Sequence, residues 1–402
     1  MCDYETCERH NDFPKFGPYG FVLAFGLVSL LMDTVYEGAL AVQGSLLASF
    51  GASALVIGAV SGIGEATALA GRLATGPLAD RTGRYWLCAI AGYAITALSV
   101  PAMGFAGSLA GVAALVIFER FGKSLRTPSR DAMLSHAASS VGVGKGFGLH
   151  ELLDQIGAVA GPLAVAGLLS ITKNDYRVAL GVLAAPGALA ILVLLMLKAK
   201  VPDPAQYEMG ERRATPTSAA GETAHVSLPR EFWVYACTCG LMLAGVATYG
   251  VIAYHMVLAG VADEALVPAL YAIAMGVDAV FAVATGFVYD KIGPRTLLVL
   301  PLVCAAIPFF VYADSVSLAA IGVALWGVGI GIQESTMRAV VSDLVPSDKR
   351  ASAFGIFSVF VGVGGLAGGV IAGALYGMGI PAIVAFTCVV ETIALVALVR
   401  LF

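Results

Sequence analysis

Charged residues are scarce in this 402-residue chain, where Asp, Glu, Lys and Arg together make up 12% of the sequence. Hydrophobic residues make up 59%, and the mean hydropathy is +0.88. So few polar groups cannot cover the surface of a soluble globule of this length. The net charge of −4 is small and by itself identifies no partner. We therefore predict an integral membrane protein.

Several signatures of other protein classes are also missing. The seven cysteines form no disulfide pattern. The first 18 residues are polar and the apolar run after them is too long for a signal sequence, so we expect no cleavable signal peptide. The chain has no nucleotide-binding P-loop, no H-E-x-x-H helix and no G-x-S-x-G elbow. These absences disfavour an enzyme, and we expect neither a cofactor nor a bound metal.

Long apolar runs dominate what is present. A spanning helix needs about 20 mostly apolar residues, whereas membrane β-strands would show segments of about ten alternating residues. The runs here are long and rich in Ala, Gly and Leu, so we predict an all-α integral membrane protein with twelve transmembrane helices. The predicted helices cover residues 19–47, 53–79, 85–106, 109–135, 147–171, 177–199, 231–257, 265–289, 295–312, 316–343, 351–376 and 380–402.

One long polar stretch interrupts these runs near the middle of the chain. It is rich in proline, serine and threonine, which is typical of a linker. The predicted parts are a cytoplasmic tail at 1–18, a six-helix bundle at 19–199, a cytoplasmic linker at 200–230 and a second six-helix bundle at 231–402.

Lys and Arg are distributed unevenly between the predicted loops. If both termini lie on one side, the opposite side holds mainly Lys173 and Arg177. Cytoplasmic loops carry an excess of these residues, so we expect a multi-pass protein of a prokaryotic inner (plasma) membrane with both termini in the cytoplasm. The cations on the predicted cytoplasmic side are Arg81, Arg84, Lys145, Lys198, Lys200, Arg212, Arg213, Arg230, Lys291, Arg295, Lys349 and Arg350.

Two loop motifs lie at equivalent places in the two halves. They read Gly76-Pro77-Leu78-Ala79-Asp80-Arg81-Thr82-Gly83-Arg84 and Gly286-Phe287-Val288-Tyr289-Asp290-Lys291-Ile292-Gly293-Pro294-Arg295. Both resemble motif A of the major facilitator superfamily, and the chain is similar to that superfamily along nearly its whole length. The resemblance implies a monomeric transporter built from two pseudo-symmetric bundles, with a solute cavity between them.

The glycines of these loops allow a tight turn and close helix approach, and Asp80 can face the positive end of a neighbouring helix. In the superfamily this aspartate packs against the eleventh helix, so the resemblance implies that Asp80 and Asp290 latch the outward-facing state. Arg130 and Arg338 are candidate partners. The basic loop residues are equally explained as topology-setting charges. The expected latch residues are Gly76, Asp80, Arg81, Gly83, Arg84, Asp290, Lys291 and Gly293.

A ladder of glycines also recurs in the two halves, with Gly355, Gly364 and Gly368 in the second copy. It resembles motif C, although the final glycine pair of that motif is missing from the first copy. The resemblance implies an antiporter that exports its substrate. Alternatively, the glycines only permit close packing of the predicted helices 147–171 and 265–289. The first copy comprises Gly148, Gly157, Gly161 and Pro162.

Ionisable groups at membrane depth are costly and suggest functional sites. Asp33 and Glu37 are four residues apart and share one helix face, with Tyr36 beside them. A pair of carboxylates facing a cavity suits proton coupling. Alternatively, fixed cations neutralise the pair, which then only holds the fold.

The predicted helix 109–135 supplies such cations. Glu119, Arg120 and Lys123 lie in its middle. Arg120 falls where the resemblance places the arginine of motif B, which implies a role in proton coupling or helix positioning. Lys123 departs from that motif and could meet an anionic substrate, or form a salt bridge with Glu119 or Asp33.

The predicted helix 147–171 adds His150, Glu151 and Asp154. His150 and Asp154 are one turn apart, and histidine titrates near neutral pH, so a proton relay with Glu151 is one interpretation. A divalent metal site is a second interpretation. In a third, His150 is simply a hydrogen-bonded contact between helices.

The second half carries fewer charges, so we expect the coupling residues in the first half. Glu334 and Arg338 are four residues apart and suggest a structural ion pair. Tyr249 and Tyr254 could line the cavity. The leading hypothesis is a proton-coupled secondary transporter that exports a small polar solute by alternating access. Its expected partners are the solute, protons and the lipid bilayer, with no nucleic acid.

Two alternatives remain. In one, the protein takes up a metabolite or a metal complex that contacts the acidic residues of the predicted helix 147–171. In the other, it is a membrane sensor or assembly factor that does not transport.

Overall fold

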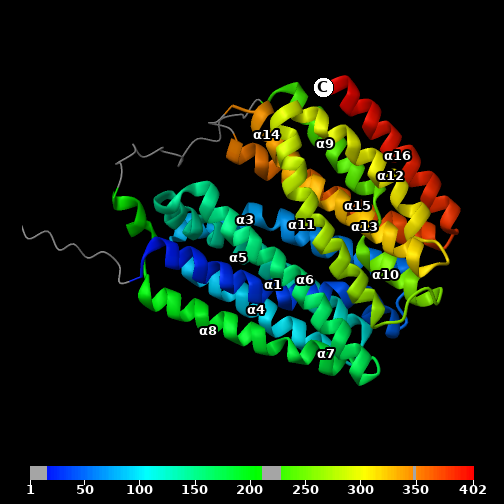
Figure 1. The fold of residues 1–402 in the computed structure, drawn as a ribbon, viewed down its shortest axis with the longest axis horizontal. Coiled ribbons are helices and arrows are strands. Elements are labelled where there is room, and N and C mark those ends of the chain that lie inside the picture. The colour runs from blue at the N-terminus through cyan, green and yellow to red at the C-terminus, as the bar shows by residue number, and fades with distance from the viewer. Residues whose placement is uncertain (1–15, 211–227, 347–349) are drawn as a thin grey trace, which may run out of the picture.

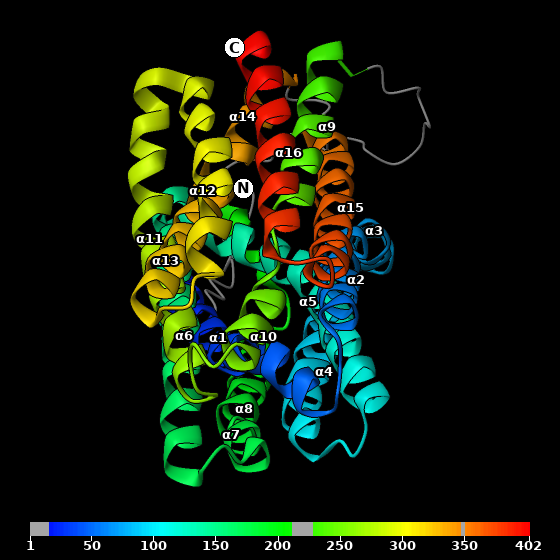
Figure 2. The same ribbon diagram turned by 90° about the vertical axis from the view of Figure 1, so that its right-hand side faces the viewer.

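The computed structural model describes residues 16–210, 228–346 and 350–402, and every regular element in these ranges is a helix (Figure 1). Most of the predicted tail, residues 1–15, and most of the predicted linker, residues 211–227, lie outside the described residues. The long helices form two groups. Those of the first half lie in the lower part of Figure 2 and those of the second half in the upper part.

The first half contains α1 (Pro18–Ser49), α2 (Ala54–Ala70), α3 (Arg72–Thr82), α4 (Tyr85–Phe105), α5 (Leu109–Val141), α6 (Val143–Thr172), α7 (Tyr176–Val182) and α8 (Ala184–Lys200), followed by η1 (Pro204–Gly210). The second half contains α9 (Arg230–Gly245), α10 (Tyr249–Leu258), α11 (Leu266–Ile292), η2 (Gly293–Leu298), α12 (Val299–Val311), α13 (Val316–Ile332), η3 (Gln333–Met337), α14 (Arg338–Leu344), α15 (Arg350–Tyr376) and α16 (Ile380–Leu401).

By length and composition, ten helical stretches within the described residues could cross a membrane. Each of the twelve predicted ranges contains a helix, and two features account for the different number. The stretch Leu266–Val311 is continuous and covers two predicted helices. The helix α5 carries six charged residues, all of them from Glu119 to Asp131, too many for an apolar span.

Local signals explain where several helices begin and end. The side chains of Ser53 and Ser108 accept hydrogen bonds from backbone N–H groups at the starts of α2 and α5. Gly83 at the end of α3 and Gly293 at the end of α11 have φ values of 62° and 66°, which favour glycine. These two glycines occupy equivalent places in the repeated loop motif, so each motif ends a helix at a glycine with positive φ, although the ψ values of 10° and −147° differ.

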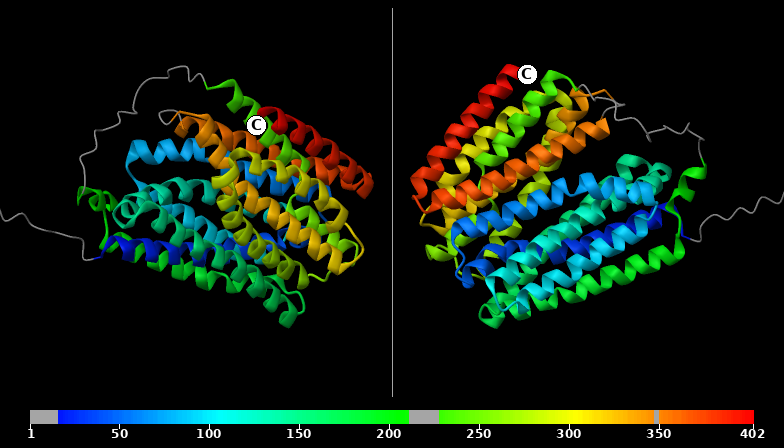
Figure 3. Two further views of the ribbon diagram at one scale, coloured as in Figure 1. Left: turned by 45° about the horizontal axis from the view of Figure 1, so that its top comes forward. Right: turned by 180° about the vertical axis from the view of Figure 1, so that it is seen from behind.

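The halves pack tightly at the end of the bundle far from the linker. There Gly58 of α2 lies against the carbonyl of Gly369 in α15, and Gly44 of α1 lies against the carbonyl of Gly250 in α10. A methyl group added to Gly58 or Gly44 would overlap the facing oxygen. The right-hand view in Figure 3 shows α2, in blue, lying beside α15, in orange.

The glycine ladder makes contacts other than those expected. Gly157 and Gly161 of α6 lie against backbone carbonyls of α1, and a larger residue would overlap them. Gly364 and Gly368 of α15 lie in the same way against α9. The ladder therefore joins α6 to α1 rather than to α11. Gly148 faces open space and makes no close contact, and Pro162 lies inside α6.

The start of the linker packs back on the first half. The Tyr207 hydroxyl in η1 donates a hydrogen bond to the Phe16 carbonyl over 2.8 Å, and the Ser140 hydroxyl donates to the Tyr207 carbonyl over 2.7 Å. Burial raises the pKa of Tyr207 to about 12, so its hydroxyl remains a donor at neutral pH. This contact anchors η1 beside the ends of α1 and α5.

Candidate functional site

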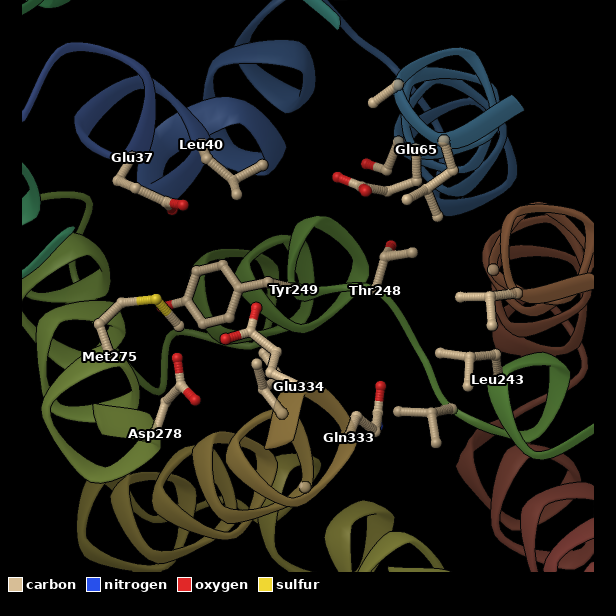
Figure 4. A pocket seen from close by; sticks show the side chains of 18 of the residues that line it. Glu37, Leu40, Glu65, Leu243, Thr248, Tyr249, Met275, Asp278, Gln333 and Glu334 are labelled. Atoms are coloured by element: carbon tan, nitrogen blue, oxygen red, sulfur yellow. The ribbon is translucent and has the colours of Figure 1, made fainter. Parts of the chain in front are cut away.

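A cavity of about 420 Å³ lies between the two halves and is lined by helices of both (Figure 4). On α15 its lining residues run from Phe354 to Gly365. The glycine contact of α15 with α2 lies beyond this range, at Gly369. The cavity therefore extends from the middle of the bundle toward the linker end, and glycine packing closes the opposite end.

Two carboxyl groups of α1 lie in the cavity wall. Asp33 and Glu37 share one helix face, and only 7% and 8% of their surfaces are exposed. The Tyr271 hydroxyl of α11 donates a hydrogen bond to Oε2 of Glu37 over 2.6 Å. This bond joins the two halves inside the cavity. Asp154, Glu37 and Lys123 line the same cavity as Asp33.

Arg120 of α5 lies at the centre of an ion-pair network within the first half. Its guanidinium lies 3.3 Å from a carboxylate oxygen of Glu65 and 3.4 Å from one of Glu119. The guanidinium of Arg126 lies 3.8 Å from Oε1 of Glu119. The Thr96 hydroxyl donates a hydrogen bond to the same Glu119 oxygen over 3.3 Å. Glu119 does not line the cavity. It is instead the buried counter-ion of two arginines.

Lys123 interacts mainly with Tyr36. Its Nζ atom donates a hydrogen bond to the Tyr36 hydroxyl over 3.0 Å and lies 4.2 Å from the ring centroid. The guanidinium groups of Arg126 and Arg120 lie 5.2 Å and 5.7 Å from the same centroid. Three cations thus surround one electron-rich ring. The salt bridge expected from Lys123 to Glu119 or Asp33 is not among the ion pairs within the described residues.

The three residues predicted on α6 separate into two groups. Glu151 and Asp154 line the cavity, and Gln155 donates a hydrogen bond to Glu151 over 3.3 Å. His150 is 3% exposed and does not line the cavity. Its Nε2 atom lies 3.1 Å from the Ser29 hydroxyl of α1. Of the three interpretations, the hydrogen-bonded contact between helices describes His150 here. Within the described residues, no three His, Cys, Asp or Glu side chains are grouped to hold a metal.

The second half also contributes acids to the cavity. Asp278 of α11 and Glu334 of η3 point into the same space as Glu37, beside Tyr249 (Figure 4). Asp278 is 2% exposed, and its Oδ1 atom has no hydrogen-bond partner in the described residues. Acids from both halves therefore line the cavity, and the expectation that the coupling residues lie in the first half stays a prediction. The sequence shows Asp278 inside an apolar helix but assigns no role to it.

A π-helical turn changes the expected geometry of Glu334 and Arg338. Between α13 and α14, residues Gln333–Met337 form a wider turn, so residues four apart no longer lie directly above one another. The two side chains form no ion pair among the described residues, and both line the cavity. The prediction of a structural pair was wrong. Tyr249 lines the cavity as expected, whereas Tyr254 packs on Tyr376 outside it.

The repeated loop motifs differ between the halves. The Tyr85 hydroxyl donates a hydrogen bond to Asp80 over 3.0 Å. The expected partner Arg130 pairs instead with its neighbour Asp131, at 2.9 Å. Neither Asp80 nor Asp290 forms an ion pair within the described residues. The remaining motif residues are largely exposed: Arg81, Arg84 and Lys291 are exposed, and Gly76 and Gly293 are intermediate.

Comparisons with known proteins agree with this architecture. The family model of the Major Facilitator Superfamily matches residues 23–307 and 262–402. An uncharacterized protein of Mycobacterium tuberculosis is 48% identical over 383 residues, which is 95% of this chain and 93% of the relative. An uncharacterized MFS-type transporter of Methanocaldococcus jannaschii is 25% identical over 367 residues, covering 88% of each chain. The crystal structure of the nucleoside transporter NupG is similar, with a TM-score of 0.72 and 15% identity, over 95% of this chain and 98% of that one.

Two bundles of membrane-spanning length around a shared central cavity define a transporter fold. The chain belongs to the major facilitator superfamily. It is a multi-pass membrane protein and a transporter rather than an enzyme.

Proposed function

We propose that the protein moves a small polar solute across the membrane by alternating access, coupled to protons through Asp33 and Glu37. One observation carries the proposal: both acids lie in a cavity shared by the halves, and Glu37 is bonded directly to Tyr271 of the other half. A proton taken up at this place acts on the contact between the bundles as well as on the solute site.

The coupling follows from hydrogen-bond chemistry. An ionised carboxylate is a stronger acceptor than a protonated one. The bond from Tyr271 to Glu37 is therefore strongest when Glu37 carries no proton, and protonation loosens a link between the halves. Asp33 lies one turn away and shares the electrostatic environment of Glu37, so either acid can hold the proton while the other binds the solute.

Charge distribution supports an orientation for this conformation. Most cations of the described loops lie at the linker end, where positive residues favour the cytoplasm. In this orientation the cavity extends toward the cytoplasm and the glycine contacts close the outer side. Asp80 and Asp290, free of ion pairs here, remain the proposed latch of the opposite, outward-facing state.

Export is the proposed direction, supported by the partial likeness of the α6 glycine ladder to motif C. Uptake of a metabolite remains the second candidate because the ladder packs α6 on α1, a contact compatible with either direction. A sensor without transport would give no solute flux in the experiment below.

The test uses purified protein in liposomes that enclose a pH-sensitive dye, challenged with organic anions, cations and zwitterions. Asp33→Asn is compared with Glu391→Gln, which changes a buried acid outside the cavity. We expect a solute-evoked proton flux that Asp33→Asn abolishes and Glu391→Gln preserves. Solute flux without a pH signal would contradict proton coupling, and no flux with any solute would contradict transport.

A further inference from the structure

Three aromatic side chains form a cluster on the second-half side of the cavity. The ring centroids of Tyr249 and Tyr271 are 4.5 Å apart, and the indole ring of Trp326 lies 5.5 Å and 6.1 Å from them. All three residues line the cavity. Their faces carry partial negative charge, which attracts cations more than neutral groups.

Three carboxyl groups border the same space. Glu37, Asp278 and Glu334 point toward it around Tyr249 (Figure 4). We call this part of the cavity, lined by Glu37, Tyr249, Tyr271, Asp278, Trp326 and Glu334, the acidic chamber. None of its three acids forms an ion pair within the described residues.

No cation of the cavity forms an ion pair with an acid of the chamber within the described residues. Arg120 is engaged by Glu65 and Glu119, and Lys123 by Tyr36. The other two cationic lining residues, Arg72 and Arg338, act on each other as like charges. Arg338 and Lys123 both act on Glu334 as opposite charges, but neither forms an ion pair with it within the described residues.

The acids of the chamber differ from the acids that hold the fold. Glu119 is buried and bound by two arginines and a threonine, as expected for a structural carboxylate. Asp278 is buried just as deeply and lines the cavity, yet its Oδ1 atom has no hydrogen-bond partner in the described residues. A buried acidic group without a partner is costly, so the chamber favours a positive charge that comes from outside the protein.

We propose that the acidic chamber binds an ammonium group of the transported solute, so that the substrate is an organic cation or carries a cationic amine. The positive group lies against the rings of Tyr249, Tyr271 and Trp326 and is balanced by the carboxylates of Asp278 and Glu334. A cavity of about 420 Å³ accommodates a small to drug-sized molecule. This proposal rests on the proposed transport function and specifies its substrate class.

The test measures binding, without any gradient, in the full-length protein in detergent. The chain contains three tryptophans, and Trp86→Phe with Trp233→Phe leaves Trp326 as the sole indole reporter. The probes share one ring and differ in charge: benzyltrimethylammonium, benzyl alcohol and benzenesulfonate. We expect benzyltrimethylammonium to change the Trp326 fluorescence saturably and to bind at least about tenfold more tightly than the other two probes.

Removing one chamber charge should weaken this binding. Asp278→Asn and Glu334→Gln should each lower the affinity for benzyltrimethylammonium about tenfold. Glu391→Gln, the buried acid outside the cavity, should leave it unchanged. Ligand-induced thermal shifts on the protein with all its tryptophans provide the same comparison if the tryptophan substitutions impair folding.

Other results would overturn the proposal. These are equal binding of the three probes, stronger binding of benzenesulfonate, or an affinity unaffected by Asp278→Asn and Glu334→Gln. A protein that binds the cation but gives no proton flux in liposomes would contradict the coupling and leave the chamber intact. Proton-coupled flux of an anion or neutral solute, without binding of benzyltrimethylammonium, would contradict the chamber and leave the transport function intact.

Discussion

The two halves share a fold but treat their buried charges differently. The four ion pairs of the described residues all lie in the first half, where Arg120 joins Glu65 and Glu119. In the second half, the buried acids Asp278 and Glu391 have oxygens without partners in the described residues. A paired network stabilises a bundle, whereas unpaired acids favour a ligand or a proton. The first half therefore contributes the paired framework, whereas acids without ion pairs in the described residues line the cavity from both halves, Asp154 of the first half among them.

The largest effect should come from breaking the paired network. In Arg120→Met, Glu119 loses one of two arginines in a buried environment, and Glu65 loses its ion pair. Removing one partner of a buried ion pair is strongly destabilising. We therefore expect the free energy of unfolding to fall by about 3 kcal/mol or more, which would appear as a poor yield and a lowered melting temperature. Arg120→Lys, which keeps the charge, should recover part of the lost stability. A normal melting temperature in Arg120→Met would contradict the structural role of this network.

The next effect concerns the carboxyl pair of the first half. Asp33→Asn removes one titratable group from the cavity wall. We expect the rate of proton-driven transport to fall at least about tenfold. Exchange of solute inside the liposomes for solute outside should continue, because this exchange needs no net proton movement. Loss of exchange together with a lower protein yield would instead assign Asp33 to holding the fold.

Removing the hydrogen bond between Tyr271 and Glu37 should have a moderate effect on stability. Tyr271→Phe removes the donor to Glu37. A hydrogen bond to a charged group contributes about 1.5–3 kcal/mol, and a double-mutant cycle with Glu37→Gln should yield a coupling energy in that range. The measurement is unfolding in detergent of the two single variants and the double variant. Simple additivity would mean that the bond does not hold the halves together.

Removing an unpaired acid should cost little or even stabilise the protein. Asp278→Asn replaces a buried carboxyl group that has an oxygen without a partner. We expect the free energy of unfolding to stay the same or to rise by up to about 1 kcal/mol, since desolvation of the carboxyl group no longer opposes folding. The measurement is the melting temperature without ligand, beside Arg120→Met. A large loss of stability would remove the distinction between the two halves.

The smallest effect on stability should come from the loop motif. Asp80→Asn weakens one exposed hydrogen bond from Tyr85 and should shift the melting temperature by less than about 2 °C. If Asp80 is a latch of the opposite conformation, the same variant should change which side a cysteine label in the cavity can reach. Asp290→Asn is the matched variant in the second half. Unchanged labelling in both variants would contradict the latch.

Much of the fold was predictable from the sequence because membrane insertion imposes simple rules. Apolar length and turn signals placed a helix in each predicted range, and the two loop motifs revealed the duplication. The breaks within helices were harder to predict. The π turn at Gln333–Met337 leaves no composition signal, yet it separates Glu334 from Arg338 and directs both into the cavity.

The candidate site was predicted only in part. Asp33, Tyr36 and Glu37 do line the cavity, because residues on one turn of a helix share a face. His150 was harder to place, since a rotation of about 100° around α6, the step from one residue to the next, separates the contact with Ser29 from the cavity wall at Glu151. Tyr271 and Trp326 were not singled out, because aromatic residues are common in apolar helices and only their approach to the carboxylates gives them meaning.

The sequence by itself determined the membrane solvent, the helices, the duplication and the superfamily, because these depend on composition and local pattern. Tertiary structure alone decided which charges are neutralised and which remain available. Pairing depends on distances of a few ångströms between helices far apart in the chain, as in Arg120 with Glu65 and Tyr271 with Glu37. Those distances arise from packing of the two halves, and no pattern within one helix specifies them.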